Sequence, residues 1–300
     1  MPGETATGVI ERTRVAIRGS LVRRRLQAVA EGKSQTLGID LNDAGVDTAL
    51  IVRQLTARHQ PDGRTQQRLA AAFQRSGDWN KVVDSLAAGD AVRRSRSARM
   101  AGALDMHLAV PWLSSLLLAH EPVVRHAAAK ALGKIGGTRS AEALLRAIQR
   151  RGPTPTLIVE LARAAPDLFL ETALCVPQRT GVKGAVAVAA GLRRRRAAVT
   201  PLLALLGSGT RRERAISCRA LAWIGAGTAI PAIAVALGDS DWMVRMSAVK
   251  ALAALKCDGY MPELDALLVD RNIRVRKAAQ NALRRLRKEM APRLMEWLWL

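Results

Sequence analysis

A 31-residue pattern recurs along this chain. Its two clearest copies lie within residues 239–286, where Arg245 or Arg276 is followed seven residues later by Leu252 or Leu283. Both copies are built from residues that form helices well, such as Ala, Leu and Arg. A tandem repeat of this length predicts stacked helical hairpins that share one core, rather than a fold arranged around a catalytic centre.

The register of the repeat follows from five arginines, each expected near the start of the second helix of a hairpin: Arg94, Arg125, Arg214, Arg245 and Arg276. The first two are 31 residues apart, as are the last three in succession. The gap of 89 residues between the second and third leaves room for two divergent repeats. The positions seven and ten residues after each arginine lie one turn apart and should face the core. They are Ala101, Leu132, Leu221, Leu252 and Leu283, then Leu104, Ile135, Ile224, Leu255 and Leu286.

The chain divides into three parts by pattern and composition. Residues 1–45 form a basic N-terminal segment and linker, with a helix predicted over 9–30 that either caps the array or lies on an anionic surface. Residues 46–290 form the repeat array, whose middle, 152–196, is broken by prolines and diverges from the pattern. Residues 291–300 form an amphipathic, Trp-containing tail that either caps the last repeat or docks a partner.

The balance of charge is strongly positive. Among 300 residues, 47 are Lys or Arg and 25 are Asp or Glu, which gives a formal net charge of +22. Such a chain attracts acidic proteins, nucleic acids or anionic lipids. A GC-rich genome would explain the excess of Arg over Lys, but it would not explain the shortage of acids. Both readings stay open.

Cysteines and apolar runs indicate the cellular setting. The three cysteines are far apart and form no CxxC pair, which predicts buried, unreactive thiols in a reducing compartment and no metal site. Neither a secretory signal nor an apolar run long enough to span a membrane is visible. We therefore expect a soluble, cytoplasmic protein that could still touch a membrane surface.

The repeated residues resemble the HEAT repeat, in particular its short bacterial form, which also occurs in phycobilisome lyases. The resemblance rests on Glu-Pro-Val-Val-Arg at 121–125 with Ala-x-x-Ala-Leu-Gly-x-Ile-Gly at 128–136, and on the copy at 245–252. It extends over about residues 78–288. It implies an all-α, right-handed solenoid of about seven or eight helical hairpins. Function does not follow from this fold, because the same fold serves many roles.

The resemblance also implies a structural role for the repeated arginines. In such repeats an acid at the turn between the two helices caps the second helix and accepts hydrogen bonds from the arginine, which packs between neighbouring repeats. The corresponding residues are Asp90, Glu121, Asp241 and Asn272. The copy at 211–214 reads Arg-Arg-Glu-Arg, so the contact of Arg214 stays open.

Enzymatic roles of related folds find little support in the residues. Deoxyhypusine hydroxylase holds two irons through repeated His-Glu pairs, whereas this chain has four histidines and one such pair, at 120–121. Phycobilisome lyases offer no residue signature to match. In related DNA glycosylases an acid lies in an aromatic-lined cleft, and four tryptophans could line one or could fill the core: Trp79, Trp112, Trp223 and Trp242. We expect no enzyme activity, no metal, no cofactor and no small-molecule substrate.

A row of cations is the best candidate for function. The residues five positions after each repeated arginine are Arg99, Lys130, Arg219, Lys250 and then the neutral Asn281. Lys134 and Arg285 follow one turn later on the same face. The resemblance places this face on the concave side of the solenoid. The alternative is that these cations form an ordinary solvent-exposed helix face with no binding role.

This row leads to three functional hypotheses. The first is a non-enzymatic scaffold that binds an acidic protein segment through Arg99, Lys130, Lys134, Arg219, Lys250 and Arg285. The second is sequence-nonspecific nucleic-acid binding through phosphates on the same face. The third is a peripheral membrane adaptor that uses the basic helix at 12–25 and the tail at 297–300.

Overall fold

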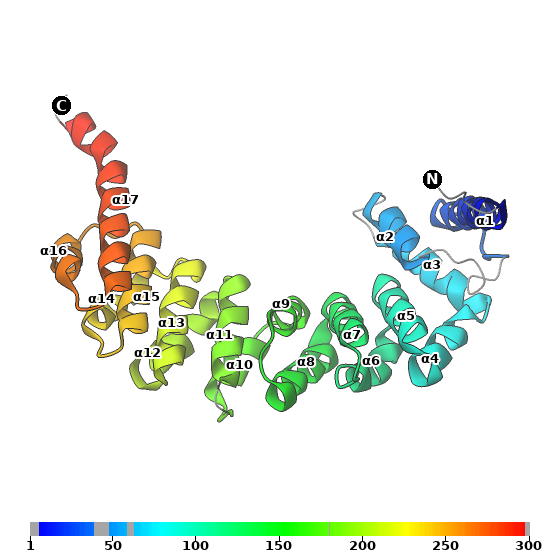
Figure 1. The fold of residues 1–300 in the computed structure, drawn as a ribbon, viewed down its shortest axis with the longest axis horizontal. Coiled ribbons are helices and arrows are strands. Elements are labelled where there is room, and N and C mark those ends of the chain that lie inside the picture. Colours follow the sequence, from blue (N-terminus) through cyan, green and yellow to red (C-terminus); the bar gives the residue numbers. More distant parts are fainter. Residues whose placement is uncertain (1–5, 39–47, 59–62, 180, 298–300) are drawn as a thin grey trace. The chain divides into compact units, whose positions relative to one another are not determined.

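The structure, a computed structural model, describes the backbone of residues 6–38, 48–58, 63–179 and 181–297. Side chains are described for 15–38, 48–57, 63–179 and 181–288. Every regular element in these ranges is a helix (Figure 1), which confirms the predicted all-α repeat architecture. The chain divides into two compact units, Met1–Ala147 and Ile148–Leu300. No helix in the described ranges is both long and apolar enough to cross a membrane.

The first unit contains two clear hairpins, α4 with α5 and α6 with α7 (Figure 1). Their second helices, α5 and α7, pack directly against each other. The helices are α1 (Ala6–Ala30), α2 (Thr48–Arg58), α3 (Arg64–Arg75), α4 (Asp78–Ala88), α5 (Ala91–Ala103), η1 (His107–Ala109), α6 (Val110–Leu116), α7 (Pro122–Ile135) and α8 (Gly137–Arg151), whose last four residues belong to the second unit.

The second unit continues the hairpin pattern with α10–α11, α12–α13, α14–α15 and α16–α17. The second helices α9, α11, α13, α15 and α17 pack in a row, each against the next (Figure 1). The elements are α9 (Pro155–Ala164), α10 (Phe169–Cys175), α11 (Val182–Leu192), η2 (Arg196–Ala198), α12 (Val199–Ser208), α13 (Arg211–Ile224), η3 (Gly227–Ala229), α14 (Ile230–Val235), η4 (Ala236–Gly238), α15 (Trp242–Ala254), α16 (Met261–Ala266), η5 (Leu267–Val269) and α17 (Ile273–Trp297).

Helix starts follow local chemistry. The helices α6, α7, α9, α14 and α16 have Pro in the first turn, where its missing N–H group costs no hydrogen bond. Asp90 caps α5 by accepting from the N–H group of Arg93. Asp241 caps α15 by accepting from the N–H group of Met243. Thr210 and Glu213 form a reciprocal capping box at the start of α13.

Most of the predicted core positions are buried. All five residues seven positions after the repeated arginines are buried, and so are four of the five residues at ten. Leu255 is the exception and is half-buried, because it follows the last residue of α15, where the next turn leaves one side open. The spacing therefore predicted the core correctly except at one helix end.

Small residues allow the second helices to approach closely. A Cβ atom on Gly102 of α5 would lie 2.7 Å from the Cα atom of Ala131 in α7, and one on Gly191 of α11 would lie 3.0 Å from the Cα atom of Ala220 in α13. With the repeated arginine as position 0, the glycines occupy position 8 and the alanines position 6 of the following repeat. Position 8 is Gly102, Gly133, Ala222 or Ala253, and position 6 is Ala131, Ala220, Ala251 or Ala282.

This contact also sets the register inside the divergent middle. Gly191 makes the position-8 contact, so position 0 of its repeat is Lys183, 31 residues before Arg214. The middle holds α9, α10 and α11, in keeping with two divergent repeats there. A lysine stands where the other repeats have arginine.

The two ends of the chain extend the helical pattern. The basic helix α1 packs against α2 and α3 and buries Val22, Leu26 and Val29, while Ile17 and Leu21 are exposed. At the other end, α17 is continuous to Trp297, so residues 291–297 prolong the last helix. The side chains of residues 289–300, including the aromatic tail, lie outside the described residues.

Candidate functional site

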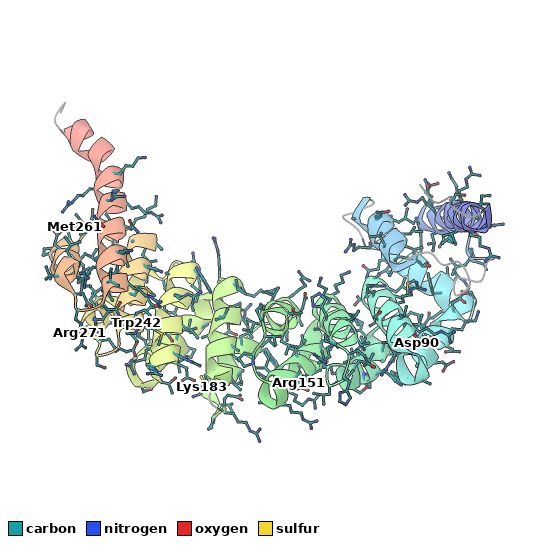
Figure 2. All side chains as sticks on the ribbon, viewed as in Figure 1. Asp90, Arg151, Lys183, Trp242, Met261 and Arg271 are labelled. Atoms are coloured by element: carbon teal, nitrogen blue, oxygen red, sulfur yellow. The ribbon has the colours of Figure 1, made fainter. Side chains whose placement is uncertain are left out.

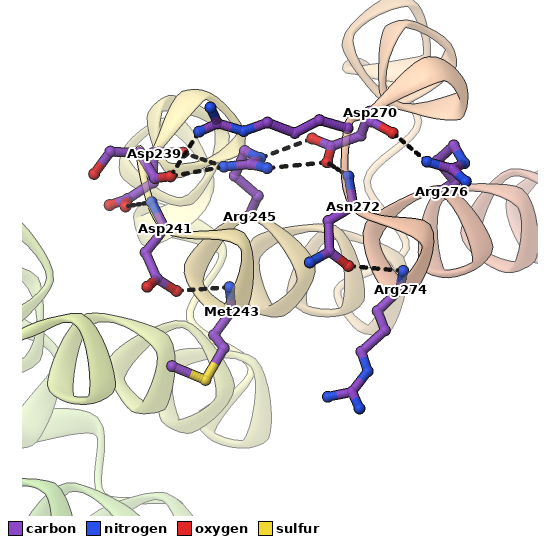
Figure 3. Close-up of polar contacts among 10 residues, drawn as sticks. Asp239, Asp241, Met243, Arg245, Asp270, Asn272, Arg274 and Arg276 are labelled. Carbon is purple, nitrogen blue, oxygen red and sulfur yellow. Dashed lines mark hydrogen bonds and ion pairs between the residues drawn. The ribbon is translucent and has the colours of Figure 1, made fainter.

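The repeated arginines join neighbouring repeats. The Nε and Nη2 atoms of Arg245 donate to the two carboxylate oxygens of Asp270 in the next repeat, at 2.7 and 2.9 Å (Figure 3). Its Nη1 atom donates to the backbone oxygens of Asp239 and Ser240 in its own turn. Arg214 binds Asp239 in the same way, with both distances 2.8 Å. Each arginine therefore holds its own turn with one edge and the following repeat with the other.

We call the repeated arginines and their carboxylate partners the ladder. Of the predicted acceptors, Glu121 does accept from Arg94, but the prediction was wrong in the second unit. Asp241 and Asn272 cap their helices, but the arginines bind Asp239 and Asp270, each two residues earlier. The Asp241 carboxylate instead accepts the N–H group of Met243 at the helix start. The ladder aspartate accepts the N–H group of the cap residue as well as the arginine.

The ladder is less complete in the first unit. Arg94 makes one contact with Glu121, at 3.2 Å, and its buried Nε atom has no partner. Arg125 donates to the backbone oxygens of Ala119 and His120. Arg214, whose own turn has no aspartate, makes a full ion pair because its partner belongs to the next repeat.

The ion pairs shift the titration of their partners. The hydrogen bond from Arg214 lowers the pKa of Asp239 below its ordinary value, and burial opposes this only in part. The hydrogen bond from Arg245 lowers the pKa of Asp270 in the same way. Both carboxylates are therefore ionised at neutral pH and stabilise the stacked repeats.

The six predicted binding residues are all exposed on second helices. In the first unit, Arg99 of α5 and Lys130 and Lys134 of α7 lie on two helices that pack together. In the second unit, the row runs over α13, α15 and α17 through Arg219, Lys250 and Arg285.

The neighbouring positions bound this row. At position 5, α11 has the apolar, half-buried Val188 and α17 has the exposed Asn281.

Partial burial, and then the charge of Lys130, lower the pKa of His126 on α7, so this histidine is neutral at pH 7.

The exposed charge of the second helices has a single sign. The acids within them, Glu160 of α9 and Glu213 of α13, are both buried, and no described side chain of these helices exposes a carboxylate. We call their exposed surface, taken in each unit separately, the second-helix face. Its cations are Arg93, Arg96, Arg99, Lys130, Lys134, Arg163, Arg211, Arg212, Arg219, Lys250, Arg274, Lys277, Arg284, Arg285, Arg287 and Lys288.

Two tryptophans belong to this cationic surface. The Arg219 guanidinium lies 5.2 Å from the centre of the Trp223 ring, and the Arg274 guanidinium lies 5.1 Å from that of Trp242. Figure 2 labels Trp242, at the start of α15. These are cation–π distances. A Cβ atom on Gly191 would lie 2.8 Å from the Trp223 ring, so only glycine leaves room for it. The hypothesis that the four tryptophans fill the core was wrong, because none of them is buried.

The cysteines differ from one another. Cys218 is buried, and burial, followed by the charge of Asp239, raises the pKa of its thiol to about 12. Cys257 is half-buried, and Cys175 is exposed because it is the last residue of α10, so the prediction of three buried thiols was wrong. Within the described part of the chain, no three His, Cys, Asp or Glu side chains gather where they could hold a metal ion.

Solved structures resemble this chain only loosely. Human deoxyhypusine hydroxylase in complex with glycerol is 20% identical, with 90% of this chain and 98% of that one covered and a TM-score of 0.36. Computationally designed armadillo repeat proteins for modular peptide recognition are 21% identical, with 79% and 98% covered and a TM-score of 0.34. The complex of CpcE and CpcF of phycocyanin lyase from Nostoc sp. PCC7120 is 18% identical, with 83% and 98% covered and a TM-score of 0.32.

The family comparison is more decisive. No curated protein matches the chain significantly. The sequence model for HEAT repeats, in contrast, matches residues 79–156, 199–284 and 230–299, which together make up more than half of the chain. These ranges contain all five repeated arginines and their core leucines. The chain belongs to the HEAT-repeat family.

Proposed function

We propose that this protein is a non-enzymatic scaffold that binds an acidic protein segment along the second-helix face. The observation that carries the proposal is the single sign of the exposed charge on the second helices. A face with cations and no exposed carboxylate attracts anionic partners and repels basic ones. Asp239 and Asp270 are held by the ladder arginines. Three cations of this face are paired with other carboxylates, namely Arg93 with Asp90, Arg163 with Glu160 and Arg287 with Asp265.

The spacing of the cations suits an extended peptide. Packed helices lie about 8–10 Å apart, so Arg219 and Lys250, at position 5 of the adjacent helices α13 and α15, present cations at roughly that interval. An extended chain advances about 3.3 Å per residue, so a carboxylate at every third residue can meet successive cations such as Arg219 and Lys250. Half-buried Ile216 and Met246 lie one turn before these cations and offer apolar contacts. A peptide that alternates acids with apolar residues matches this surface better than a uniformly charged polyphosphate.

A defined peptide tests the proposal. The probe is a fluorescein-labelled peptide of about nine residues, by design long enough to cross the adjacent helices α13, α15 and α17, with Glu at every third position and Ala and Leu between. Fluorescence anisotropy measures its affinity for the wild type and for the double variant Arg219→Glu/Lys250→Glu. The matched control, Arg146→Glu/Arg150→Glu, changes the net charge equally at exposed positions of α8, a first helix. We expect at least tenfold weaker binding for the first variant and nearly unchanged binding for the control. Equal losses would contradict the proposal.

Nucleic-acid binding is a second candidate, and Trp223 favours it. A partly exposed tryptophan beside Arg219 can stack on a base while neighbouring cations bind phosphates. Random-sequence single-stranded and duplex DNA, at about 50 and 200 mM salt, provide the test. Binding that is tighter than peptide binding, falls steeply with salt and is lost in Arg219→Glu/Lys250→Glu would favour this function. Absence of binding at the lower salt concentration would exclude it.

The exposed side of α1 supports a third candidate, a peripheral membrane adaptor. Ile17 and Leu21 are exposed beside Arg18, Arg24 and Arg25. An apolar strip flanked by cations is typical of helices that lie on anionic membranes. Flotation with anionic and neutral liposomes, repeated with Arg24→Glu/Arg25→Glu, tests it. Binding to anionic liposomes that this variant abolishes would support the adaptor, and no flotation of the wild type would exclude it.

A further inference from the structure

In α11, α13 and α15, one flank of the helix faces the next repeat, and contacts identify its positions. A Cβ atom on Gly184 of α11, at position 1, would lie 3.0 Å from the Cδ1 atom of Ile216 in α13. One on Gly191, at position 8, would lie 3.0 Å from the Cα atom of Ala220. Position 4 lies between them on the same stripe of the helix. Positions 1, 4 and 8 therefore form the stacking flank.

The stacking flank changes character in the last helix. In α11, α13 and α15 it is small or apolar, whereas in α17 positions 1, 4 and 8 are the exposed Lys277, Gln280 and Arg284. Stacking a further apolar repeat there would bury two unpaired cations, which is strongly unfavourable. Polar outer positions are typical of terminal repeats. The small or apolar residues are Gly184, Ala187, Gly191, Ala215, Cys218, Ala222, Met246, Val249 and Ala253.

The repeated arginine of α17, Arg276, lies next to this flank, and one edge of its guanidinium group makes no ion pair with a described side chain. Arg276 donates through Nη1 to the backbone oxygen of Asp270 at 2.8 Å (Figure 3), as Arg245 does in its own turn. The Nε and Nη2 atoms of Arg276 correspond to the atoms with which Arg214 and Arg245 bind an aspartate of the next repeat. Among the side chains that the structure describes, no carboxylate pairs with Arg276.

Acids later in α17 are too far away to fill this position. The helix is continuous from Ile273 to Trp297 and rises about 1.5 Å per residue. Glu289 and Glu296 are 13 and 20 residues after Arg276, so they begin roughly 20 and 30 Å along the helix axis. An aspartate that pairs with Arg276 as Asp270 pairs with Arg245 must come from another part of the chain or from another molecule.

We propose that the terminal flank, defined as Arg276, Lys277, Gln280 and Arg284, binds a carboxylate at a helix-starting turn of a partner protein. Arg276 takes toward this carboxylate the role that Arg245 takes toward Asp270. The pair of Arg245 and Asp270 shows the geometry that we expect. Asp270 lies two residues before the helix cap Asn272 and also accepts the N–H group of Asn272. Lys277 and Arg284 favour further acids beside it. The polar surface around Arg276 makes this a reversible docking site.

The ladder itself provides a probe for this site. A synthetic peptide of residues 238–254 contains Asp239, the cap residue Asp241 and the helix that follows, and an otherwise identical Asp239→Asn peptide is the control. Nitrogen-15 correlation spectra of the arginine Nε–H groups report binding, and the signal missing from Arg276→Gln identifies Arg276. We expect a saturable shift of this signal, about tenfold weaker binding of the Asn peptide, and no binding to Arg276→Gln. Arg219→Glu/Lys250→Glu should bind as the wild type does, which separates this site from the cations at position 5 of α13 and α15.

Other outcomes would overturn the inference. Equal affinity for the Asp and Asn peptides would show that the carboxylate is not recognised. Self-association in sedimentation that Arg276→Gln abolishes, without peptide binding, would assign the flank to a second copy of the chain. Circular dichroism checks that Arg276→Gln folds. If it does not, Lys277→Gln/Arg284→Gln leaves the ladder arginine in place and should weaken peptide binding several-fold, and unchanged binding would overturn the proposal.

Discussion

The ion pair between Arg245 and Asp270 should be worth much more than its counterpart between Arg94 and Glu121. The side chains of Arg245 and Asp270 are each 6% exposed and share two hydrogen bonds. Arg245→Met leaves a buried carboxylate without its partner, and such losses cost about 3–5 kcal/mol. Arg94 and Glu121 are 25% and 40% exposed and share one contact, so Arg94→Met should cost about 0–1 kcal/mol.

Urea unfolding followed by circular dichroism measures both losses. In a double variant, Asp270→Asn removes the stranded charge but keeps an acceptor for the N–H group of Asn272, so it should recover part of the loss caused by Arg245→Met. Equal losses for Arg245→Met and Arg94→Met would refute the reasoning from burial. So would a double variant that is less stable than Arg245→Met alone.

The pH dependence of stability provides an independent check on the same pair. The pKa of Asp270 is lower in the folded than in the unfolded protein. Its contribution is therefore fully present above the unfolded pKa of about 3.9 and is lost as the pH falls through the lower folded value. Between pH 7 and pH 3, the stability gap between wild type and Arg245→Met should narrow. A constant gap would contradict the assigned role of the carboxylate.

Three further predictions concern packing, capping and thiol chemistry. Gly102→Ala should destabilise the protein by about 1–3 kcal/mol because the new methyl group meets backbone, whereas Gly207→Ala on α12, which meets nothing, should stabilise it by up to about 1 kcal/mol; urea unfolding compares the two. Thr210→Ala should cost about 1 kcal/mol through loss of the cap of α13, and a loss below about 0.3 kcal/mol would contradict this. With a thiol reagent at pH 8, Cys175 should react in the folded protein, whereas Cys218 should react only after denaturation.

Sequence reasoning succeeded where one helix or one turn decides the outcome. Helical periodicity predicted the core residues Leu132 and Leu252. The resemblance to HEAT repeats implied the caps Asp90 and Asp241, which form, and also Glu121, which makes no cap hydrogen bond. These features depend on neighbours within a few residues.

It failed where the outcome depends on how two repeats stack. The turn before α15 contains two acids, Asp239 and Asp241, and only stacking decides which one meets the preceding arginine. The register at Lys183 was missed because a lysine replaces the arginine, although its spacing of 31 residues from Arg214 was visible. The single sign of the exposed charge on the second helices could not be predicted, because it depends on the burial of Glu160 and Glu213.

The site of acidic-peptide binding tests the central claim most directly. Zero-length carbodiimide crosslinking joins a carboxylate only to a lysine that it contacts, so crosslinked lysines mark where the Glu-containing peptide lies. The second-helix face offers Lys130 and Lys250, whereas Lys81 lies on α4, a first helix. The proposed function predicts crosslinks at Lys130 and Lys250, each suppressed by excess unlabelled peptide, and little at Lys81. Crosslinking at Lys81 equal to that at Lys250 would contradict it.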